Sequence, residues 1–221
     1  MRETPRARLG GRLLPVALMS FGLLPLLANA VRRLAEAAGA PGSGAGGGGG
    51  VSLPVVAHVI GATVFVVLGA LQFSASLRSR RPAWHRVAGR LAAVGAVLAA
   101  ASGVWLAFDA LEDDGALLFT FRLVAAAGMG AFIVLGVVAI LRRRLRRHRA
   151  WMIRAYAIGL GAATQLFTLG FGEELIGTGQ VGVALLNAGG WAINLAVAEW
   201  VIRRAPRSVA RPVADLAGVV R

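Results

Sequence analysis

The sequence lacks cysteine and lysine, and charged residues of any kind are scarce in it. Without cysteine the chain has no disulfide, no thiolate metal site and no cysteine nucleophile. All 24 basic residues are arginines, against 10 acidic residues, and the formal net charge is +14. A chain rich in arginine, alanine and glycine but without lysine indicates a GC-rich bacterial genome.

Apolar residues take the place of the missing charges. Hydrophobic residues make up 57% of the 221 residues and charged residues only 15%, and the mean hydropathy is +0.70. Soluble domains have about 25% charged residues. The composition therefore predicts an integral membrane protein.

Six segments are long enough to cross a bilayer, which takes about 20 apolar residues in a helix. We expect an all-α membrane fold, a bundle of six transmembrane helices at residues 12–31, 53–75, 88–108, 116–141, 150–172 and 181–202. The chain then divides into an N-terminal helix at 1–35, a glycine-rich linker at 36–52, a five-helix core at 53–204 and a cytoplasmic tail at 205–221.

The arginines alternate with the helices. They gather before the first segment, between the second and third, between the fourth and fifth and after the sixth, whereas the connections "DALEDDG" and "GEELIGTGQ" are acidic or neutral. Because basic loops stay in the cytoplasm, we expect both termini inside and the chain in the bacterial inner membrane. The same clusters predict contact with anionic lipid headgroups and not with nucleic acid. A second copy of the chain or another membrane protein stays open as a partner.

The first hydrophobic segment has two interpretations. A basic start, an apolar stretch from Leu13 to Leu27 and "ANA" ending at Ala30 are typical of a cleavable secretory signal. The length of the apolar run, and Arg32 and Arg33 directly after it, favour an uncleaved helix.

Small residues recur every four positions in two segments. Such rows let helix backbones approach closely within a membrane, so we expect these faces to pack inside the bundle. The rows are Gly95, Ala99 and Gly103, and Ala155, Gly159 and Ala163.

Function in such a chain should lie in the polar side chains that a bilayer penalises. We expect His58, Arg122 and Asn187 at similar depth, about 8–9 Å from the outer ends of their helices, where they can meet. Glu173 or Glu174 is a candidate partner for Arg122. A second layer near the inner ends contains Gln72, His85, His148, Arg154 and Glu199.

Arg154 lies inside the fifth apolar segment, close to its start, where a guanidinium is costly without a partner. We expect it to pair with Glu199 on the neighbouring helix, because a guanidinium forms two parallel bonds to a carboxylate. Alternatively, Glu199 pairs with Arg203 in its own helix and Arg154 extends to the headgroups. The acidic residues of the third connection are expected to form a solvated turn: Asp109, Glu112, Asp113 and Asp114.

Four motifs are spaced along the last five segments: "HVIGATVFVVLGALQF" from His58, "LRSRRPAWHRVAGR", "HRAWMIRAYAIGLGAATQL" and "WAINLAVAEWVIR". Together they resemble the bacterial multi-pass membrane protein family of domain of unknown function 2306 (DUF2306), over about residues 53–204. The resemblance implies an integral membrane protein with no established activity. Family members often have an arginine later in the fifth helix, where this chain has Gln165, so the role of that arginine does not carry over. The matching positions are His58, Gln72, Phe73, Arg78, His85, Arg86, Gly89, Arg90, His148, Arg149, Trp151, Met152, Arg154, Trp191 and Glu199.

Three classes of function stay open. The residues favour binding or transport of a small ligand, with His58, Arg122 and Asn187 lining an outward pocket and the inner layer gating it or binding an anionic or quinone-like group. An interaction or assembly protein would use the same polar residues to hold helices together. A b-type electron carrier would hold one haem between His85 and His148, since two haems need four histidines and the chain has three.

Enzymatic chemistry has little support in the sequence. No nucleophile stands in a pattern that brings a base to it, and no cluster has the spacing of metal ligands. The sequence therefore favours a protein that is not an enzyme and leaves any catalytic residue unknown. We expect no metal and no resident cofactor, with haem b as the exception that the histidines leave open.

Overall fold

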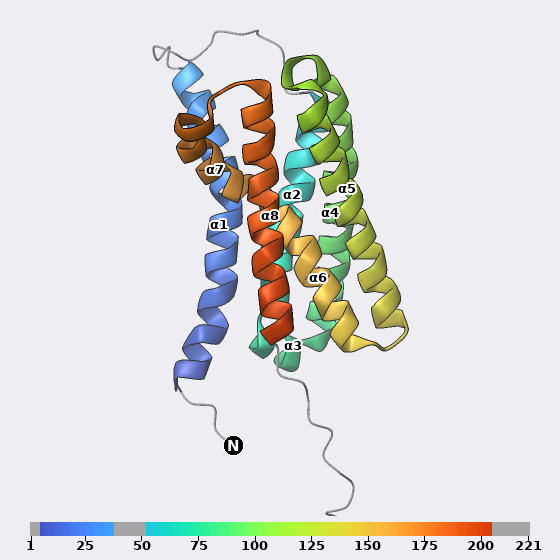
Figure 1. Cartoon of the computed structure of the whole chain (residues 1–221). Helices are drawn as coiled ribbons and strands as arrows, with labels where there is room; N and C mark the ends of the chain where they lie inside the picture. The colour runs from blue at the N-terminus through green and yellow to red at the C-terminus, as the bar shows by residue number, and fades with distance from the viewer. Residues whose placement is uncertain (1–4, 38–51, 205–221) are drawn as a thin grey trace, which may run out of the picture.

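The computed structural model describes residues 5–37 and 52–204, which are helical apart from short connections (Figure 1). The tail expected at 205–221 and most of the linker expected at 36–52 lie outside the described residues. The helices are α1 (Pro5–Ala37), α2 (Leu53–Gln72), α3 (Ala75–Arg80), α4 (Pro82–Asp109), α5 (Leu111–Leu141), α6 (Leu145–Gly159), α7 (Gly161–Ile176) and α8 (Gln180–Arg204).

Four of the described helices are long and apolar enough to cross a membrane, namely α2, α4, α5 and α8. Within α1, a shorter apolar stretch covers Leu13–Asn29. This stretch packs on the rest of the bundle, where Phe21 stacks on Phe167 of α7 with ring centroids 6.1 Å apart. The protein is thus an all-helical membrane protein with several candidate spans.

The fifth predicted segment differs from expectation. We expected one helix at 150–172, but the structure has two, α6 and α7, which meet at Leu160, so that prediction is wrong. Leu160 has φ −78° and ψ −3°, and the glycines on either side of it, Gly159 and Gly161, favour a helix poorly. In Figure 1, α6 crosses the bundle obliquely and α7 leads off towards α1. Hydropathy alone does not reveal the break, because the sequence stays apolar through it.

The helix pair α2 and α4 packs closely through small residues. A Cβ atom on Gly61 would stand 2.7 Å from the Ala99 backbone nitrogen, and one on Gly95 would stand 2.8 Å from the Gly61 carbonyl oxygen. Only glycine allows this approach. Ala99 is buried here, as are Ala155 and Ala163 in the second predicted row. The prediction that both rows face the bundle interior is confirmed.

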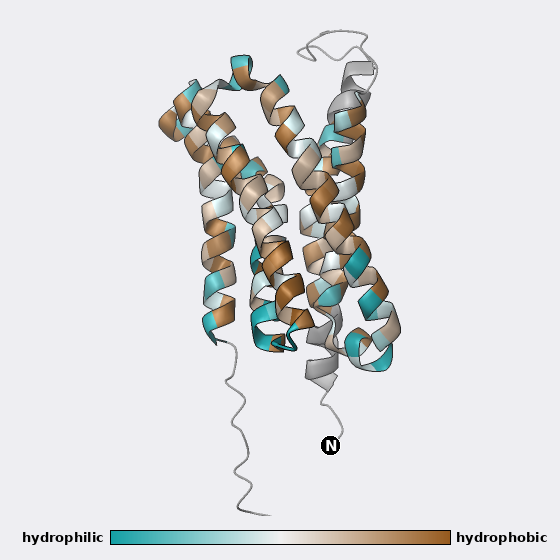
Figure 2. Cartoon of the chain, turned by 90° about the vertical axis from the view of Figure 1, so that its right-hand side faces the viewer, coloured by the Kyte–Doolittle hydropathy of each residue, from teal (hydrophilic) through white to brown (hydrophobic). Residues whose placement is uncertain are grey.

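Hydrophilic residues gather mainly at the two ends of the bundle (Figure 2), and the sequence gives these ends different charge. We call the end that carries the α4–α5 and α7–α8 connections the acidic end, and the end that carries the α5–α6 connection the basic end. Acidic side chains at the first include Asp109, Asp113 and Glu174, and arginines at the second include Arg80, Arg86, Arg144 and Arg203. The apolar core between the ends is built on Phe65, Met129, Ile133 and Tyr156.

Candidate functional site

A cavity of about 840 Å³ lies within the bundle and reaches to the acidic end. Asp109 and Asp113 line it at that end, and Met129 and Trp191 line it near the middle of the bundle. Its wall is mostly apolar, and several alanines and glycines leave the space open. The predicted residues His58, Arg122 and Asn187 all line this one cavity.

His58 is held by α4. Its Nδ1 lies 2.9 Å from the Ala99 carbonyl oxygen and 3.4 Å from the Ser102 hydroxyl. Because a carbonyl only accepts, Nδ1 carries the proton, and in the neutral ring Nε2 is an acceptor. Gly103 leaves room for the ring, since a Cβ there would lie 3.3 Å from His58 Cε1. The imidazole is fixed in orientation and offers one acceptor for a ligand.

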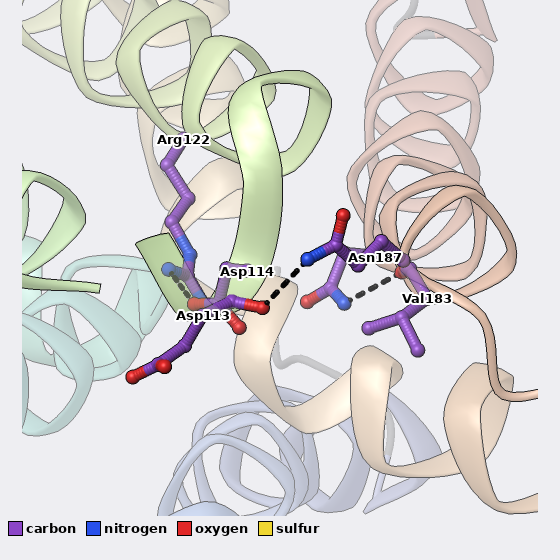
Figure 3. A network of polar contacts seen from close by, with 6 residues as sticks. Asp113, Asp114, Arg122, Val183 and Asn187 are labelled. Carbon is purple, nitrogen blue, oxygen red and sulfur yellow. Dashed lines mark hydrogen bonds and ion pairs between the residues drawn. The ribbon is translucent and has the colours of Figure 1, made fainter. Parts of the chain in front are cut away.

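Arg122 pairs with Asp114, eight positions earlier in the sequence (Figure 3). We expected Glu173 or Glu174 as its partner, so that prediction is wrong. Asp109, Glu112 and Asp113 are exposed, as expected of a solvated turn, and only Asp114 is partly buried. Residues Leu111 to Asp114 form a helical turn, and Gly115, at φ 78°, reverses the chain so that this turn folds back over α5. Gly115 has to be glycine, because a side chain rarely adopts this φ.

The other wall of the cavity comes from α7 and α8. Asn187 Nδ2 donates to the Val183 carbonyl at 2.8 Å, and Gln165 Nε2 donates to the Asn187 carbonyl at 3.0 Å. Gln180 Nε2 donates to the Asp113 carbonyl at 3.0 Å and so joins α8 to the acidic turn. Gln165 also lies on the cavity wall.

The break between α6 and α7 borders the cavity and is held by α8. Asn194 Nδ2 donates to the Ala157 carbonyl at 3.1 Å, and Asn194 Oδ1 accepts from Thr164 Oγ1 at 2.8 Å. The last carbonyls of a helix lack partners within it, and a lipid environment supplies none. Asn194 therefore satisfies the end of α6 and ties it to the first turn of α7.

The predicted inner layer lies at the basic end, but it does not share one cavity. Gln72 Nε2 donates to the Leu68 carbonyl in its own helix at 3.3 Å, and His148 Nδ1 lies 2.9 Å from the Gly136 carbonyl. His85 stands at the start of α4, near the arginines of the basic end. None of these three lines the cavity that reaches the acidic end.

Arg154 and Glu199 form the predicted pair between α6 and α8. Arg154 Nε and Nη2 donate to the two carboxylate oxygens at 2.5 and 3.0 Å. The guanidinium carbon also lies 4.6 Å from the centroid of the Trp151 ring, a cation–π contact. The pair is present as expected, and the alternative pairing of Glu199 with Arg203 is not the one adopted.

Few side chains on the cavity wall are chemically reactive. Among the described residues no group of three or more His, Asp or Glu side chains is placed to hold a metal ion. His58, the one imidazole on the cavity wall, faces no hydroxyl nucleophile other than Ser102, whose hydroxyl is engaged with the Leu98 carbonyl at 2.6 Å. A mostly apolar cavity with a few fixed polar groups is typical of a small-molecule site.

Sequence reasoning missed the roles of three residues, Asp114, Asn194 and Trp191. Asp114 belonged to a segment interpreted as solvated, and its role depends on the backbone reversal at Gly115. Asn194 is an amide in the middle of an apolar helix, and that alone is a signal that it has a buried partner. Trp191 was matched to the family but given no place, and it lies on the cavity wall.

These features define the class: a helical membrane protein with an internal cavity that ionisable side chains line. The chain belongs to the family DUF2306, whose model, described as a predicted membrane protein, matches residues 55–202. A comparison with curated proteins found no match, and neither did one with solved structures.

Proposed function

We propose that the protein binds a small amphipathic ligand in the cavity lined by His58, Arg122 and Asn187, and either holds it or passes it across the membrane. One observation carries the proposal: three polar residues from three helices, two of them ionisable, line a single cavity of about 840 Å³. Ionisable groups within a membrane domain are expensive and usually mark a ligand or ion path. The volume suits a small organic molecule.

The wall indicates the chemistry of the ligand. Phe65, Met129 and Trp191 offer apolar and aromatic contact along the wall. His58 Nε2 and the Asn187 and Gln165 side chains offer hydrogen bonds, while the charge of Arg122 is already balanced by Asp114. A neutral molecule with an apolar body and a hydrogen-bonding head, such as a quinone-like ring, matches this wall better than a bare anion does.

The membrane arrangement is part of the proposal. The α6–α7 pair, broken at Leu160, crosses once, so that with α1, α2, α4, α5 and α8 the chain has six crossings. The basic end faces the cytoplasm with both termini, and the cavity opens outwards. The arginine content and the absence of lysine support the inner membrane of a bacterium.

The residues at the basic end have a role of their own in this proposal. Arg154 and Glu199 hold α6 against α8 below the break at Leu160, and Gln72, His85 and His148 close the cytoplasmic end. Movement of α6 relative to α7 would then gate the cavity, as discontinuous helices do in many transporters.

The test uses the chain purified in mild detergent. Small molecules that co-purify are identified by mass spectrometry, and an absorption spectrum of the same sample shows whether a haem is bound, for which His85 and His148 are the candidate ligands. We expect one organic species to co-purify at about one molecule per chain, and we expect no Soret band in the absorption spectrum. A haem at one per chain would contradict the proposal in favour of electron transfer.

Two matched variants locate the ligand. Ala126→Phe places a ring in the cavity, and Val124→Phe places the same ring two positions away on an exposed face of α5. We expect the first to reduce the co-purified species about tenfold or more and the second to leave it unchanged. Equal retention by both variants would place the ligand elsewhere and end the proposal.

A further inference from the structure

A second hollow lies at the basic end, between α5 and α6, and has no part in the ligand cavity. It measures about 300 Å³, and the two hollows share no lining residue. Four arginines surround it, and the remaining wall is apolar. The arginines are Arg142, Arg144, Arg147 and Arg154.

These arginines are short of acidic partners. Among the described residues the ion pairs are Arg122 with Asp114 and Arg154 with Glu199. Arg154 uses Nε and Nη2 for Glu199, which leaves Nη1 for a second acceptor. The chain reversal between α5 and α6 brings the cluster together: Arg143 adopts φ 55°, and Arg144 and Arg147 then start α6 beside the end of α5. Like charges held this close favour an anion between them.

The apolar wall distinguishes the hollow from a simple anion site. Leu135, Val138 and Ala139 of α5 run from the arginines towards the middle of the bundle, and Leu135 and Val138 are exposed on the surface that faces lipid. Trp151 lies between the two regions and stacks on Phe132 with centroids 5.5 Å apart. Arginines beside an apolar strip are complementary to a lipid, because the arginines can contact its anionic headgroup and the strip can contact its acyl chain.

We infer that this hollow is a binding site for one anionic phospholipid of the cytoplasmic leaflet. Its phosphate lies among Arg144, Arg147 and the free Nη1 of Arg154, and one acyl chain lies along Leu135 and Val138. Basic pockets between transmembrane helices at the cytoplasmic face bind such headgroups, and a guanidinium forms bidentate hydrogen bonds to phosphate. The lipid thereby contacts Arg154, which also holds Glu199, and so it stabilises the junction of α6 with α8.

Native mass spectrometry of the full chain in detergent, with phosphatidylglycerol or phosphatidylcholine added at low ratio, tests the site. We expect one phosphatidylglycerol per chain to be retained and phosphatidylcholine to be lost. Each arginine near an anionic lipid contributes about 1 kcal/mol, so Arg144→Gln with Arg147→Gln should lower retention about tenfold or more. The control pair Arg80→Gln with Arg81→Gln removes the same charge at the same end without touching the hollow, and it should change retention less than about twofold. Equal losses in both pairs would mean diffuse attraction and would overturn the inference.

A second pair of variants keeps every charge. Val138→Trp fills the apolar strip, and Leu141→Trp places the same ring on the exposed surface of α5 outside the hollow. We expect only Val138→Trp to lower phosphatidylglycerol retention, with the thermal unfolding temperature recorded for all variants. Glycerol phosphate, which has the head but no chain, should not compete at concentrations where the lipid saturates. Competition by glycerol phosphate, or retention unaffected by Val138→Trp, would show a site for a soluble anion and contradict the lipid assignment.

Discussion

Arg154 and Glu199 join α6 to α8 across 45 positions of sequence, and both side chains stay partly exposed, at 21% and 35%. A fully buried pair of this kind would lose about 3–5 kcal/mol when one partner is removed. Because water still reaches this pair, a smaller value applies, and we expect a coupling of about 1 kcal/mol. A double-mutant cycle with Arg154→Gln and Glu199→Gln, measured by unfolding in detergent, checks it.

The same cycle with Arg203→Gln in place of Arg154→Gln is the control. Arg203 lies four positions after Glu199 on α8 but is not its partner in the structure. We expect coupling near zero for that cycle. The reverse order of the two couplings would mean that Glu199 pairs within its own helix and that Arg154 is free.

A second prediction concerns Asn194, which holds the break at Leu160. Asn194→Leu removes its bond to the Ala157 carbonyl and leaves Thr164 without its acceptor. Hydrogen bonds between membrane helices contribute about 0.6 kcal/mol each and at most about 1.7, so we expect a loss of about 1–3 kcal/mol. Thermal unfolding in detergent measures it. The control is Thr120→Val, which removes an exposed hydroxyl that bonds within its own helix. It should change the free energy of unfolding by less than about 0.5 kcal/mol. An equal loss in both variants would show that Asn194 does not hold the break.

A third prediction compares two glycines that lie in helices. Gly61→Ala places a methyl group against the backbone of α4, at 2.7 Å from the Ala99 nitrogen, whereas Gly130→Ala meets nothing within 4 Å. Overpacking costs about 1–3 kcal/mol, and alanine favours a helix over glycine by about 1 kcal/mol. We expect Gly61→Ala to lower the unfolding temperature and Gly130→Ala to leave it unchanged or raise it. A lower temperature for both would mean that α2 and α4 do not pack as the structure has them.

The sequence predicted features that depend on composition and local spacing. Hydropathy located the long helices, four-residue rows located the faces of α4 and α6–α7 that pack inside, and relative depth alone paired Arg154 with Glu199. The features it missed depend on backbone direction. The α6–α7 break leaves hydropathy unchanged, and the pairing of Arg122 with Asp114 depends on a positive φ at Gly115 that no side-chain pattern encodes.

The two glycines around Leu160 and the amide of Asn194 were the available signals for the break. Glycine is common in membrane helices, so Gly159 and Gly161 alone did not distinguish a break from close packing. Taken together with Thr164 and with Asn194 on α8, the two glycines indicate helix carbonyls that need hydrogen-bond donors from another helix.

The central claim is that polar residues of this membrane domain line a cavity open to the outside, and a single introduced cysteine tests it most directly because the chain has no other thiol. Ala126 lines the cavity, and Val124 faces outward from α5 with 64% of its surface exposed where lipid would lie. Intact cells that carry Ala126→Cys or Val124→Cys are treated with a charged thiol reagent that does not cross membranes. The account predicts labelling at position 126 and none above background at position 124. Labelling at 126 that is no faster than at 124 would contradict it.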